Sequence, residues 1–534
     1  MTRWAMVADI DRCVGCQTCT AACKHANATS PAVQWRKVLD IEAGSYPNVT
    51  RTFVPVGCQH CEDPPCMHVC PSTATRRRPD GIVTIDYDIC IGCGYCDVAC
   101  PYQARFMIDA PGFAYGLTAM QHEIEREDPH RAGVAQKCTF CSDRIDFGLA
   151  NGLTPGVDPD ATPACVNSCI ADALHFGDLD DPDSSVSRLL REQKHFRMHE
   201  ELGTEPRFHY VYEKADGGAP APAAAREQPA TPGMIRTRGV EPWHQLHWDW
   251  KAAGNFMCGG AGVGLFTCAS IAALYGAPGF ALLPAALALV AVGLFLVLLK
   301  IGRPLRFAHV LRQPQRSWMA REAWIACIFF PLAALAFWSE SRSLLVAATI
   351  AALLFLVSQA MILKEAKGIP AWREPLIVPL MVATGLTEGA GLFVALAAPI
   401  APSTESKLAA AAVLILVLAR ELAWRRYLGA LRTQGAPIRT LQILDALTFR
   451  LLLLGLVFPI ALVAAGSIIT AAAAPLFAAA GLCAFAAGWV LKFTLVVRAA
   501  YNQGFSVEHT PGRGMGIARP PVKPGWSMAS ERAQ

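Results

Sequence analysis

Sixteen of the twenty cysteines of this 534-residue chain lie in four compact groups within its first third. The groups are Cys13, Cys16, Cys19 and Cys23; Cys58, Cys61, Cys66 and Cys70; Cys90, Cys93, Cys96 and Cys100; and Cys138, Cys141, Cys165 and Cys169. Because four thiolates hold one cubane 4Fe-4S cluster, sixteen can hold four. Structural zinc is the alternative, but zinc sites usually combine two CxxC pairs and not a triplet with a distant fourth ligand. The pattern therefore predicts a chain folded around four iron–sulfur clusters.

The spacing within each group predicts which cysteines share a cluster. A CxxCxxC loop points three sulfurs into one cup, and the fourth cysteine begins a helix and binds the other cluster of a pair. Pro71 and Pro101 suit such helix starts because proline lacks the N–H that would be unpaired there. Group four departs from the pattern, since Ile170 replaces the proline. The expected sets are Cys58, Cys61, Cys66 with Cys100; Cys90, Cys93, Cys96 with Cys70; Cys13, Cys16, Cys19 with Cys169; and Cys138, Cys141, Cys165 with Cys23.

Composition divides the chain into unlike parts. Apolar residues make up 53% and charged residues 17%, but most charges lie in the first part and long apolar runs fill the second. The net charge of +4 gives no argument for binding nucleic acid. We expect an α+β, tandem bacterial-ferredoxin-like domain over 1–213, an Ala/Pro/Gly-rich linker over 214–242, an all-α eight-helix transmembrane bundle over 243–501, and an irregular tail over 502–534.

Local patterns add detail to both halves. Trp4–Ile10 and Phe208–Tyr212 predict strands, and Pro79-Asp80-Gly81 predicts a turn before the β-branched run Ile82–Ile85. The first ten residues do not show the basic start followed by a long apolar core that is typical of a secretory signal. In the second half, Gly259–Gly262 predicts close helix packing.

Eight predominantly apolar segments are candidates to cross a membrane. Most are about 20 residues long, which is enough to span the hydrocarbon core. Buried helices of a soluble protein are the alternative. The cysteines within these segments, Cys258, Cys268, Cys327 and Cys483, are expected to be buried apolar residues. The segments lie near 253–275, 278–300, 322–339, 343–363, 375–399, 406–424, 444–467 and 472–498.

The cysteine-rich half resembles the four-cluster subunit of the dimethyl sulfoxide reductase family of molybdopterin oxidoreductases. The apolar half resembles, more loosely, the eight-helix membrane anchor of the same enzymes, so the chain looks like a fusion of two subunits that are usually separate. The first resemblance rests on the run Cys58–Arg105, on Lys137–Cys141 with Arg144, and on Pro163–Cys165. The second rests on Gly302–Arg306, Ser317–Glu322 and Asn502–Phe505.

The resemblance implies a subunit that carries electrons between a partner protein and the quinone pool of the membrane. The partner would hold a bis-pterin (bis-MGD) molybdenum or tungsten centre, and it would oxidise sulfite or an acyl-CoA, or reduce a sulfoxide. The closest-looking branch, through Trp248–Trp250, Gly254–Phe256 and Asn502–Phe505, is that of sulfite dehydrogenase and phenylacetyl-CoA acceptor oxidoreductase. An ion-translocating or purely structural anchor, whose clusters do not react with quinone, is the alternative.

Five charged or titratable residues are candidates for the quinone site. In the family, a histidine two residues before the glycine matching Gly302, and an acid at the place of Glu322, look like quinol-binding groups. Here Lys300 occupies the histidine's place, and His309 is a candidate to replace it as a proton carrier. Glu388 lies in the middle of a predicted spanning helix, where charge is costly and usually functional, and Arg450 is a candidate partner for it. The alternative is a structural carboxyl that is hydrogen-bonded to a neighbouring helix.

The distribution of basic residues predicts the orientation of the membrane helices. Eight crossings leave both flanks of the bundle on one side, and the even-numbered loops carry most of the Lys and Arg. The positive-inside rule therefore predicts a multi-pass protein of the bacterial inner membrane with its cluster domain in the cytoplasm. The basic residues are Lys300, Arg303, Arg306, Arg312, Arg316, Arg321, Lys364, Lys367, Arg373, Arg425, Arg426, Arg432 and Arg439, against Arg342 and Lys407 in the odd-numbered loops.

Overall fold

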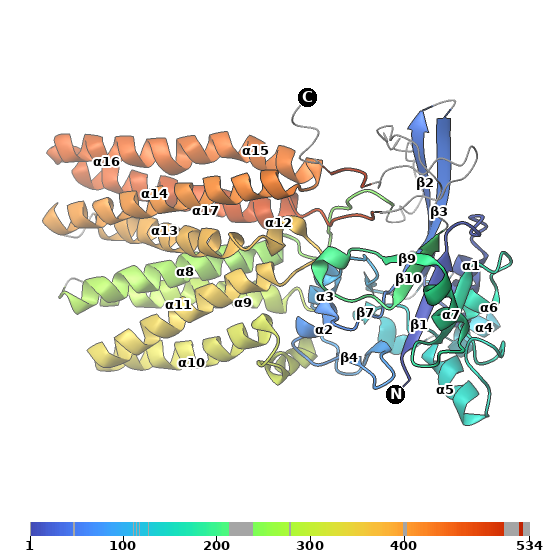
Figure 1. Cartoon of the computed structure of the whole chain (residues 1–534). Coiled ribbons are helices and arrows are strands. Elements are labelled where there is room, and N and C mark those ends of the chain that lie inside the picture. Colours follow the sequence, from blue (N-terminus) through green and yellow to red (C-terminus); the bar gives the residue numbers. More distant parts are fainter. Residues whose placement is uncertain are drawn as a thin grey trace. The chain divides into compact units, whose positions relative to one another are not determined.

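The chain forms two compact units in the computed structural model (Figure 1). The first, here the cluster unit, contains Met1–Trp243 and Asn502–Trp526, and the second, here the helical unit, contains His244–Tyr501. The structure describes residues 2–31, 33–45, 48–110, 112–113, 115–116, 118–126, 128–212, 239–276, 279–398, 403–506 and 523–526. Most of the predicted linker, and most of the predicted tail, lie outside the described residues.

A four-stranded sheet forms the centre of the cluster unit. Its order is β8–β1–β10–β9, with β1 antiparallel to β8 and parallel to β10. Every residue of β1 is buried, as expected for an apolar strand covered on both faces. The two strands predicted in this sheet are confirmed. Their bounds are β1 (Trp4–Asp9), β8 (Leu174–Asp178), β9 (Lys194–Arg197) and β10 (Phe208–Tyr212).

Three two-stranded ribbons complete the strands of this unit. The predicted turn before Ile82–Ile85 is present, because β4 (Thr75–Arg77) pairs with β5 (Val83–Ile85) and Gly81 adopts φ +86° between them. The hairpin of β2 (Arg36–Ser45) and β3 (Asn48–Gly57) was not anticipated from the sequence. The third ribbon joins β6 (Phe106–Met107) and β7 (Ala135–Gln136).

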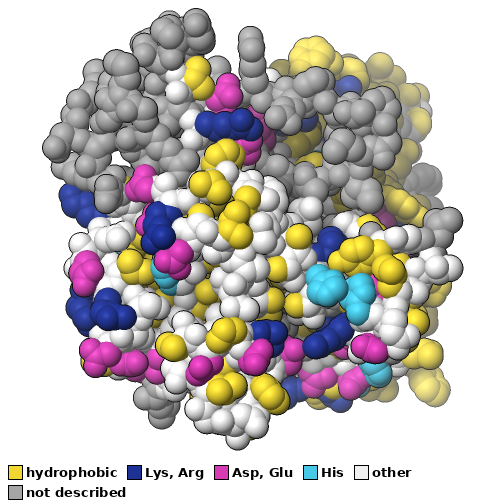
Figure 2. All heavy atoms as spheres, turned by 90° about the vertical axis from the view of Figure 1, so that its right-hand side faces the viewer, with side chains coloured by type: hydrophobic (Ala, Val, Ile, Leu, Met, Phe, Trp, Pro, Cys, Tyr) yellow, Lys and Arg dark blue, Asp and Glu magenta, His cyan; other side chains and the backbone are white. Residues whose placement is uncertain are grey.

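Short helices carry five of the cysteines of this unit, which are Cys19, Cys23, Cys66, Cys96 and Cys165. The α-helices are α1 (Thr18–Asn27), α2 (Pro65–His68), α3 (Tyr95–Ala99), α4 (Gln121–Arg126), α5 (Ser142–Ala150), α6 (Ala164–Asn167) and α7 (Ser185–Glu192). Two 3₁₀ turns are η1 (Pro129–Arg131) and η2 (Glu200–Leu202). On the face of this unit seen in Figure 2, basic and acidic side chains are interspersed and do not form a patch of one sign.

The helical unit is a bundle of long helices that run side by side (Figure 1). Its α-helices are α8 (Trp250–Leu274), α9 (Leu283–Leu298), α10 (Trp318–Ser339), α11 (Arg342–Lys364), α12 (Pro370–Arg373), α13 (Ile377–Ala397), α14 (Ser403–Gln434), α15 (Ile438–Leu452), α16 (Phe458–Ile468) and α17 (Ala473–Phe493). The 3₁₀ segments are η3 (Phe280–Leu282), η4 (Pro304–Arg312) and η6 (Thr470–Ala472), and the π-helical segments are η5 (Leu453–Val457) and η7 (Thr494–Arg498).

Seven helical stretches of the described chain are long and apolar enough to cross a membrane, and they mark the chain as a membrane protein. The sequence predicted an eighth over 406–424, within α14. In that helix the uncharged run is only 408–419, between Lys407 and Arg420, so α14 does not meet the same criterion. The expected fold class, a cysteine-rich α+β domain followed by a helical membrane region, is confirmed. The seven stretches are Trp250–Leu274, Phe280–Leu298, Trp318–Ser339, Arg342–Lys364, Ile377–Ala397, Ile438–Ile468 and Thr470–Arg498.

Glycines allow the helices of the bundle to approach closely. A Cβ atom on Gly389 of α13 would lie 1.9 Å from the carbonyl carbon of Gly264 of α8. A Cβ atom on Gly262 would lie 2.8 Å from the carbonyl oxygen of Ala286 in α9. Among the cysteines expected to be buried here, Cys258 is buried, but the expectation is wrong for Cys327, which is exposed on α10.

The residues just after the bundle belong to the cluster unit. Asn502 Oδ1 accepts hydrogen bonds from Gln103 Nε2, at 3.1 Å, and from the Trp243 backbone N–H, at 2.8 Å. Phe505 lies in the hydrophobic core of the unit, and Trp526 Nε1 donates to the carbonyl oxygen of Gln503. The cluster unit therefore contains segments of the chain that precede and follow the helical unit.

Candidate metal centres and buried polar sites

The cysteine groups combine tight turns with short helices. Gly94, immediately before α3, adopts φ +72°, and Gln17, immediately before α1, adopts φ +62°. A left-handed residue next to a right-handed one can direct successive backbone N–H groups into one concavity, which suits an anionic group. Cys96 lies on α3, and Cys19 and Cys23 lie on α1, so turn and helix together position sulfurs from both parts.

The structure brings together the two sets expected from groups two and three. We call the first site C (Cys58, Cys61, Cys66 and Cys100) and the second site D (Cys90, Cys93, Cys96 and Cys70). Burial raises the pKa of the Cys61 thiol, and negative charge on its three partners raises it further. Burial likewise raises the pKa of Cys96, and charge on Cys93, Cys90 and Cys70 adds to the shift. The members of each set therefore lie within strong electrostatic reach of one another.

The sets expected from groups one and four are also brought together. The members of site A (Cys13, Cys16, Cys19 and Cys169) line one cavity, beside residues that include Gln17 and Val38. In site B (Cys138, Cys141, Cys165 and Cys23), burial raises the pKa of Cys23, and charge on each of its three partners raises it further. The long insert between Cys141 and Cys165 thus does not separate them in space.

The cluster unit supplies hydrogen-bond donors to sulfur, as iron–sulfur ligation requires. Arg105 Nη2 donates to Cys66 Sγ at 2.8 Å, and the backbone N–H of Ala173 donates to Cys169 Sγ at 3.2 Å. Arg36 is fully buried, yet its Nε and Nη1 have no acceptor among the described residues. Because cysteines of sites A and B act electrostatically on this guanidinium, cluster sulfides are the acceptors that would satisfy it. The donor set therefore fits iron–sulfur clusters.

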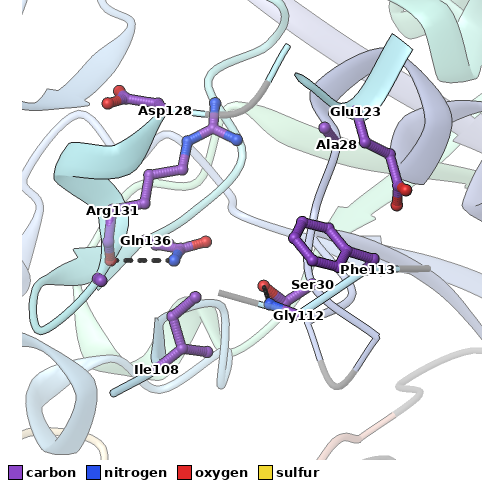
Figure 3. A pocket seen from close by; sticks show the side chains of 10 residues that line it. Ala28, Ser30, Ile108, Gly112, Phe113, Glu123, Asp128, Arg131 and Gln136 are labelled. Carbon is purple, nitrogen blue, oxygen red and sulfur yellow. Dashed lines mark hydrogen bonds between the residues drawn. The ribbon is translucent and has the colours of Figure 1, made fainter. Parts of the chain in front are cut away.

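A separate pocket of the cluster unit contains no cysteine (Figure 3). Phe113, Glu123 and Arg131 are among the residues that line it, and Gln136 Nε2 donates to the Arg131 carbonyl oxygen at 3.2 Å. This pocket is distinct from the four cysteine sites.

In the helical unit, Glu322 lies in a buried polar group formed by three helices. Asn255 Nδ2 of α8 donates to Glu322 Oε1 of α10 at 3.2 Å, and Gln359 Nε2 of α11 donates to the Asn255 carbonyl oxygen at 3.2 Å. All three side chains are buried. Asn255 Oδ1 and Gln359 Oε1 accept no hydrogen bond within the described part of the chain. The group therefore has unused acceptors beside a carboxyl.

Lys300 and His309, the other two quinone-site candidates near Glu322 in the sequence, do not belong to this polar group. Lys300, which follows α9, forms an ion pair with Asp249 at 3.5 Å, and Asp249 caps the start of α8. His309 lies half-buried in η4, the segment that connects α9 with α10. Trp324 of α10 donates to the carbonyl oxygen of Leu311, which holds η4 against that helix.

The sequence named the wrong partner for Glu388. Lys492 Nζ of α17 donates to Glu388 Oε2 of α13 at 2.6 Å and to the Phe256 carbonyl oxygen of α8 at 2.9 Å, and both charged side chains are fully buried. Arg450 is exposed on α15 instead. Lys492 lies near the end of α17, and nothing in the sequence favoured it over Arg450 as the partner of Glu388.

Room for this ion pair comes from glycines. A Cβ atom on Gly260 would lie 2.0 Å from Lys492 Nζ, and one on Gly488 would lie 2.5 Å from Glu388 Cγ. A second buried cation, Arg420 of α14, was also missed, and it donates to the carbonyl oxygens of Ala484 and Gly455. Gly260, which belongs to the stretch predicted to pack closely, therefore also accommodates buried charge, and so does Gly488.

Comparison with known proteins matches the cysteine-rich half. The model of a 4Fe-4S dicluster domain matches residues 49–115, which contain both groups that make up sites C and D. A selenate reductase subunit of Mesobacillus selenatarsenatis is 40% identical over 225 residues, which are 39% of this chain and 72% of that protein. A sulfite dehydrogenase subunit of Allochromatium vinosum is 37% identical over 227 residues, which are 40% of this chain and 83% of that protein.

The name of another relative mentions a quinol. The Hdr-like menaquinol oxidoreductase iron–sulfur subunit 1 of Archaeoglobus fulgidus is 36% identical over 240 residues, which are 40% of this chain and 84% of that protein. Each of these matches covers most of the relative but well under half of this chain, because this chain is much longer.

Proposed function

The chain belongs to the family of iron–sulfur subunits of molybdopterin oxidoreductases, and we therefore propose that it carries electrons between a molybdopterin catalytic subunit and the membrane quinone pool. It is an iron–sulfur electron-transfer subunit with its own membrane helices, so one chain provides both relay and anchor. The observation that carries the proposal is the joining of four cysteine sets, A to D, to a membrane bundle with a buried carboxyl. The substrate of the complex, whether sulfite, an acyl-CoA or a sulfoxide, depends on the catalytic partner.

In this proposal the sixteen cysteines of sites A to D hold four 4Fe-4S clusters. Each bound cluster accepts and releases one electron. The cysteines hold the iron, and buried donors such as Arg105 stabilise the sulfur charge. Cys165 lies beside Cys138, and Cys169 lies beside Cys13. These positions support the proposal that both cysteines of group four bind iron.

The buried polar group around Glu322 is the proposed quinone site. Oxidation of a quinol releases two electrons and two protons, and reduction of a quinone consumes the same, so the site needs a group that exchanges protons. Glu322 supplies a carboxyl, and the unused acceptors on Asn255 and Gln359 suit the hydroxyl groups of a quinol. His309 lies in η4, between α9 and α10, and is the proposed carrier of the proton toward water, whereas Lys300 is paired with Asp249.

We retain the even number of crossings predicted from the sequence as a proposal. The cluster unit contains chain from before α8 and after η7, which supports the proposal that the helical unit begins and ends on one side of the membrane. Seven spans alone would leave the two flanks on opposite sides. We therefore propose that α14 also crosses, with Arg420 satisfied by helix carbonyl oxygens, and that the basic even-numbered loops place the cluster unit in the cytoplasm of a bacterium.

Iron content tests the relay. Chain purified in detergent without air is expected to bind about sixteen iron atoms and to show EPR signals from 4Fe-4S clusters on reduction. A molybdenum or tungsten protein is expected to co-purify with it. A colourless preparation, or one with far less iron, would contradict the proposal.

Replacement of Glu322 by glutamine tests the quinone site. The rate of cluster reduction by a quinol analogue is expected to fall roughly 10²-fold or more, because the amide cannot exchange the proton. Dithionite is expected to reduce the clusters of this variant normally, which would show that they are intact. Glu340→Gln, an exposed change at the end of the same helix, is the matched control and is expected to leave the rate unchanged. A Glu322→Gln rate equal to that of the wild type would exclude this role.

The alternative of an ion-translocating or purely structural anchor has one observation in its favour, the buried Glu388–Lys492 pair. Addition of a quinol analogue distinguishes the two. The relay requires the EPR signals of the clusters to change on this addition, and constant signals would favour the alternative.

A further inference from the structure

Three basic side chains are fully buried among the cysteines of the cluster unit. Arg36, Arg105 and Lys137 are each only 1% exposed, whereas Lys and Arg are almost never fully buried without a partner. Buried charge of this kind is expensive unless an opposite charge compensates it. Each of the three lies beside cysteines of two different sites.

Arg105 lies between sites C and D. Its Nη2 donates to Cys66 Sγ of site C at 2.8 Å, and its Nη1 donates to Thr75 Oγ1 at 3.1 Å. The thiolates with the largest effect on it belong to Cys66 of site C and Cys96 of site D. One guanidinium group therefore interacts with cysteines of both site C and site D.

Lys137 lies between sites B and C. Its Nζ donates to the carbonyl oxygens of Val83 and of Cys138, the latter at 2.6 Å, and these acceptors suit a charged ammonium group. The thiolates that act most strongly on it belong to Cys58 of site C and Cys138 of site B. Cys58 and Cys138 also act on each other, so the two sites are adjacent.

Arg36 lies between sites A and B. It begins β2, its Nη2 contacts Met6 Sδ at 3.0 Å, and its guanidinium stacks 4.8 Å from the centre of the Phe208 ring. Its other donors, Nε and Nη1, have no acceptor in the described chain. The thiolates that act on it belong to Cys165, Cys138 and Cys23 of site B and to Cys19 of site A.

The contact of Arg105 with Cys66, together with the cysteines that act electrostatically on each cation, indicates the order A, B, C, D, with a buried cation between successive sites. We propose that Arg36, Lys137 and Arg105 are positioning residues that raise the reduction potentials of the two clusters flanking each gap. The inference rests on the proposed binding of four clusters. It adds that the buried cations, as well as the cysteine ligands, determine the reduction potentials of the clusters.

The physical reason is the charge change on reduction. A 4Fe-4S cluster with four thiolates is an anion, and reduction adds one further negative charge. A nearby cation in a buried site attracts the reduced form more strongly than the oxidised form, because water does not screen the interaction. Removal of one cation should therefore lower the potentials of the two flanking clusters and leave the two distant ones nearly unchanged.

An EPR-monitored redox titration of the full chain, purified with its partner, tests this pattern. In Arg105→Gln the reduction potentials of sites C and D are expected to fall, while those of sites A and B stay unchanged. In Arg36→Met the potentials of sites A and B should fall. In Lys137→Met the potentials of sites B and C should fall. Arg105→Lys and Lys137→Arg keep the charge and are expected to titrate close to wild type. Arg3→Gln removes an exposed arginine of the same unit, and no potential should change.

Iron content, measured on the same samples, separates the possible failures. Low iron in the unmodified chain would contradict the proposed function itself. Full iron with unchanged potentials in the neutral variants, or with all four potentials shifted equally, would overturn this inference alone. If the neutral variants lose iron, the charge-conserving variants test the proposal instead. Retained iron and near wild-type potentials in these variants would support it. Lowered potentials in Arg105→Lys would show that hydrogen-bond geometry, and not charge, is responsible.

Discussion

Replacement of Lys492 by methionine is expected to destabilise the helical unit by about 3–5 kcal/mol. The change removes the cation that contacts Glu388 at 2.6 Å and leaves a fully buried carboxylate without its partner. Equilibrium unfolding in mixed detergent micelles, followed by the helical circular dichroism signal, measures the loss. The effect is large because Glu388 is fully buried, so that solvent cannot replace the ammonium group.

Two control variants make this result specific. The double variant Glu388→Gln/Lys492→Met removes both charges and is expected to recover a large part of the lost stability, because no unpaired charge remains. Arg450→Met removes an exposed charge on α15 and is expected to change stability by no more than about 0.5 kcal/mol. A Lys492→Met protein as stable as wild type would show that the pair is not ionised in the membrane.

Replacement of Cys61 by alanine is expected to stop electron transfer through the chain. In the proposed order A, B, C, D, site C lies inside the relay, and electron transfer slows steeply when the distance between carriers grows. The variant is expected to lose about four iron atoms. Quinone-linked turnover of the complex should fall to background, while its catalytic partner still reacts with a soluble electron dye.

The matched control is Cys327→Ala, which removes an exposed cysteine of α10. Iron content and quinone-linked turnover are expected to remain at wild-type values in this variant. Cys61→Ala that keeps all its iron would exclude Cys61 as a ligand. Loss of iron with full quinone-linked turnover would instead show that electrons bypass site C.

Much of the cluster unit followed from local sequence. The spacing of cysteines is a short-range property, and so are the turn before Ile82–Ile85 and the strand at Trp4–Asp9, which explains why these were predictable. The β2–β3 hairpin was not predicted, although it carries Arg36 at its start. Its role depends on which groups surround that residue, and no local pattern contains this information.

The two-part architecture could be derived from the residues alone, because cysteine spacing and long apolar runs are both encoded over short stretches of chain. The partners of the buried charges became known only from the folded chain: Glu388 contacts Lys492 from a helix about a hundred residues away, and not Arg450. The same holds for Arg36, Lys137 and Arg105, which are buried and interact electrostatically with cysteines from different groups of the sequence. Electrostatic pairing depends on distance in space, and in a folded chain that distance bears little relation to separation along the sequence.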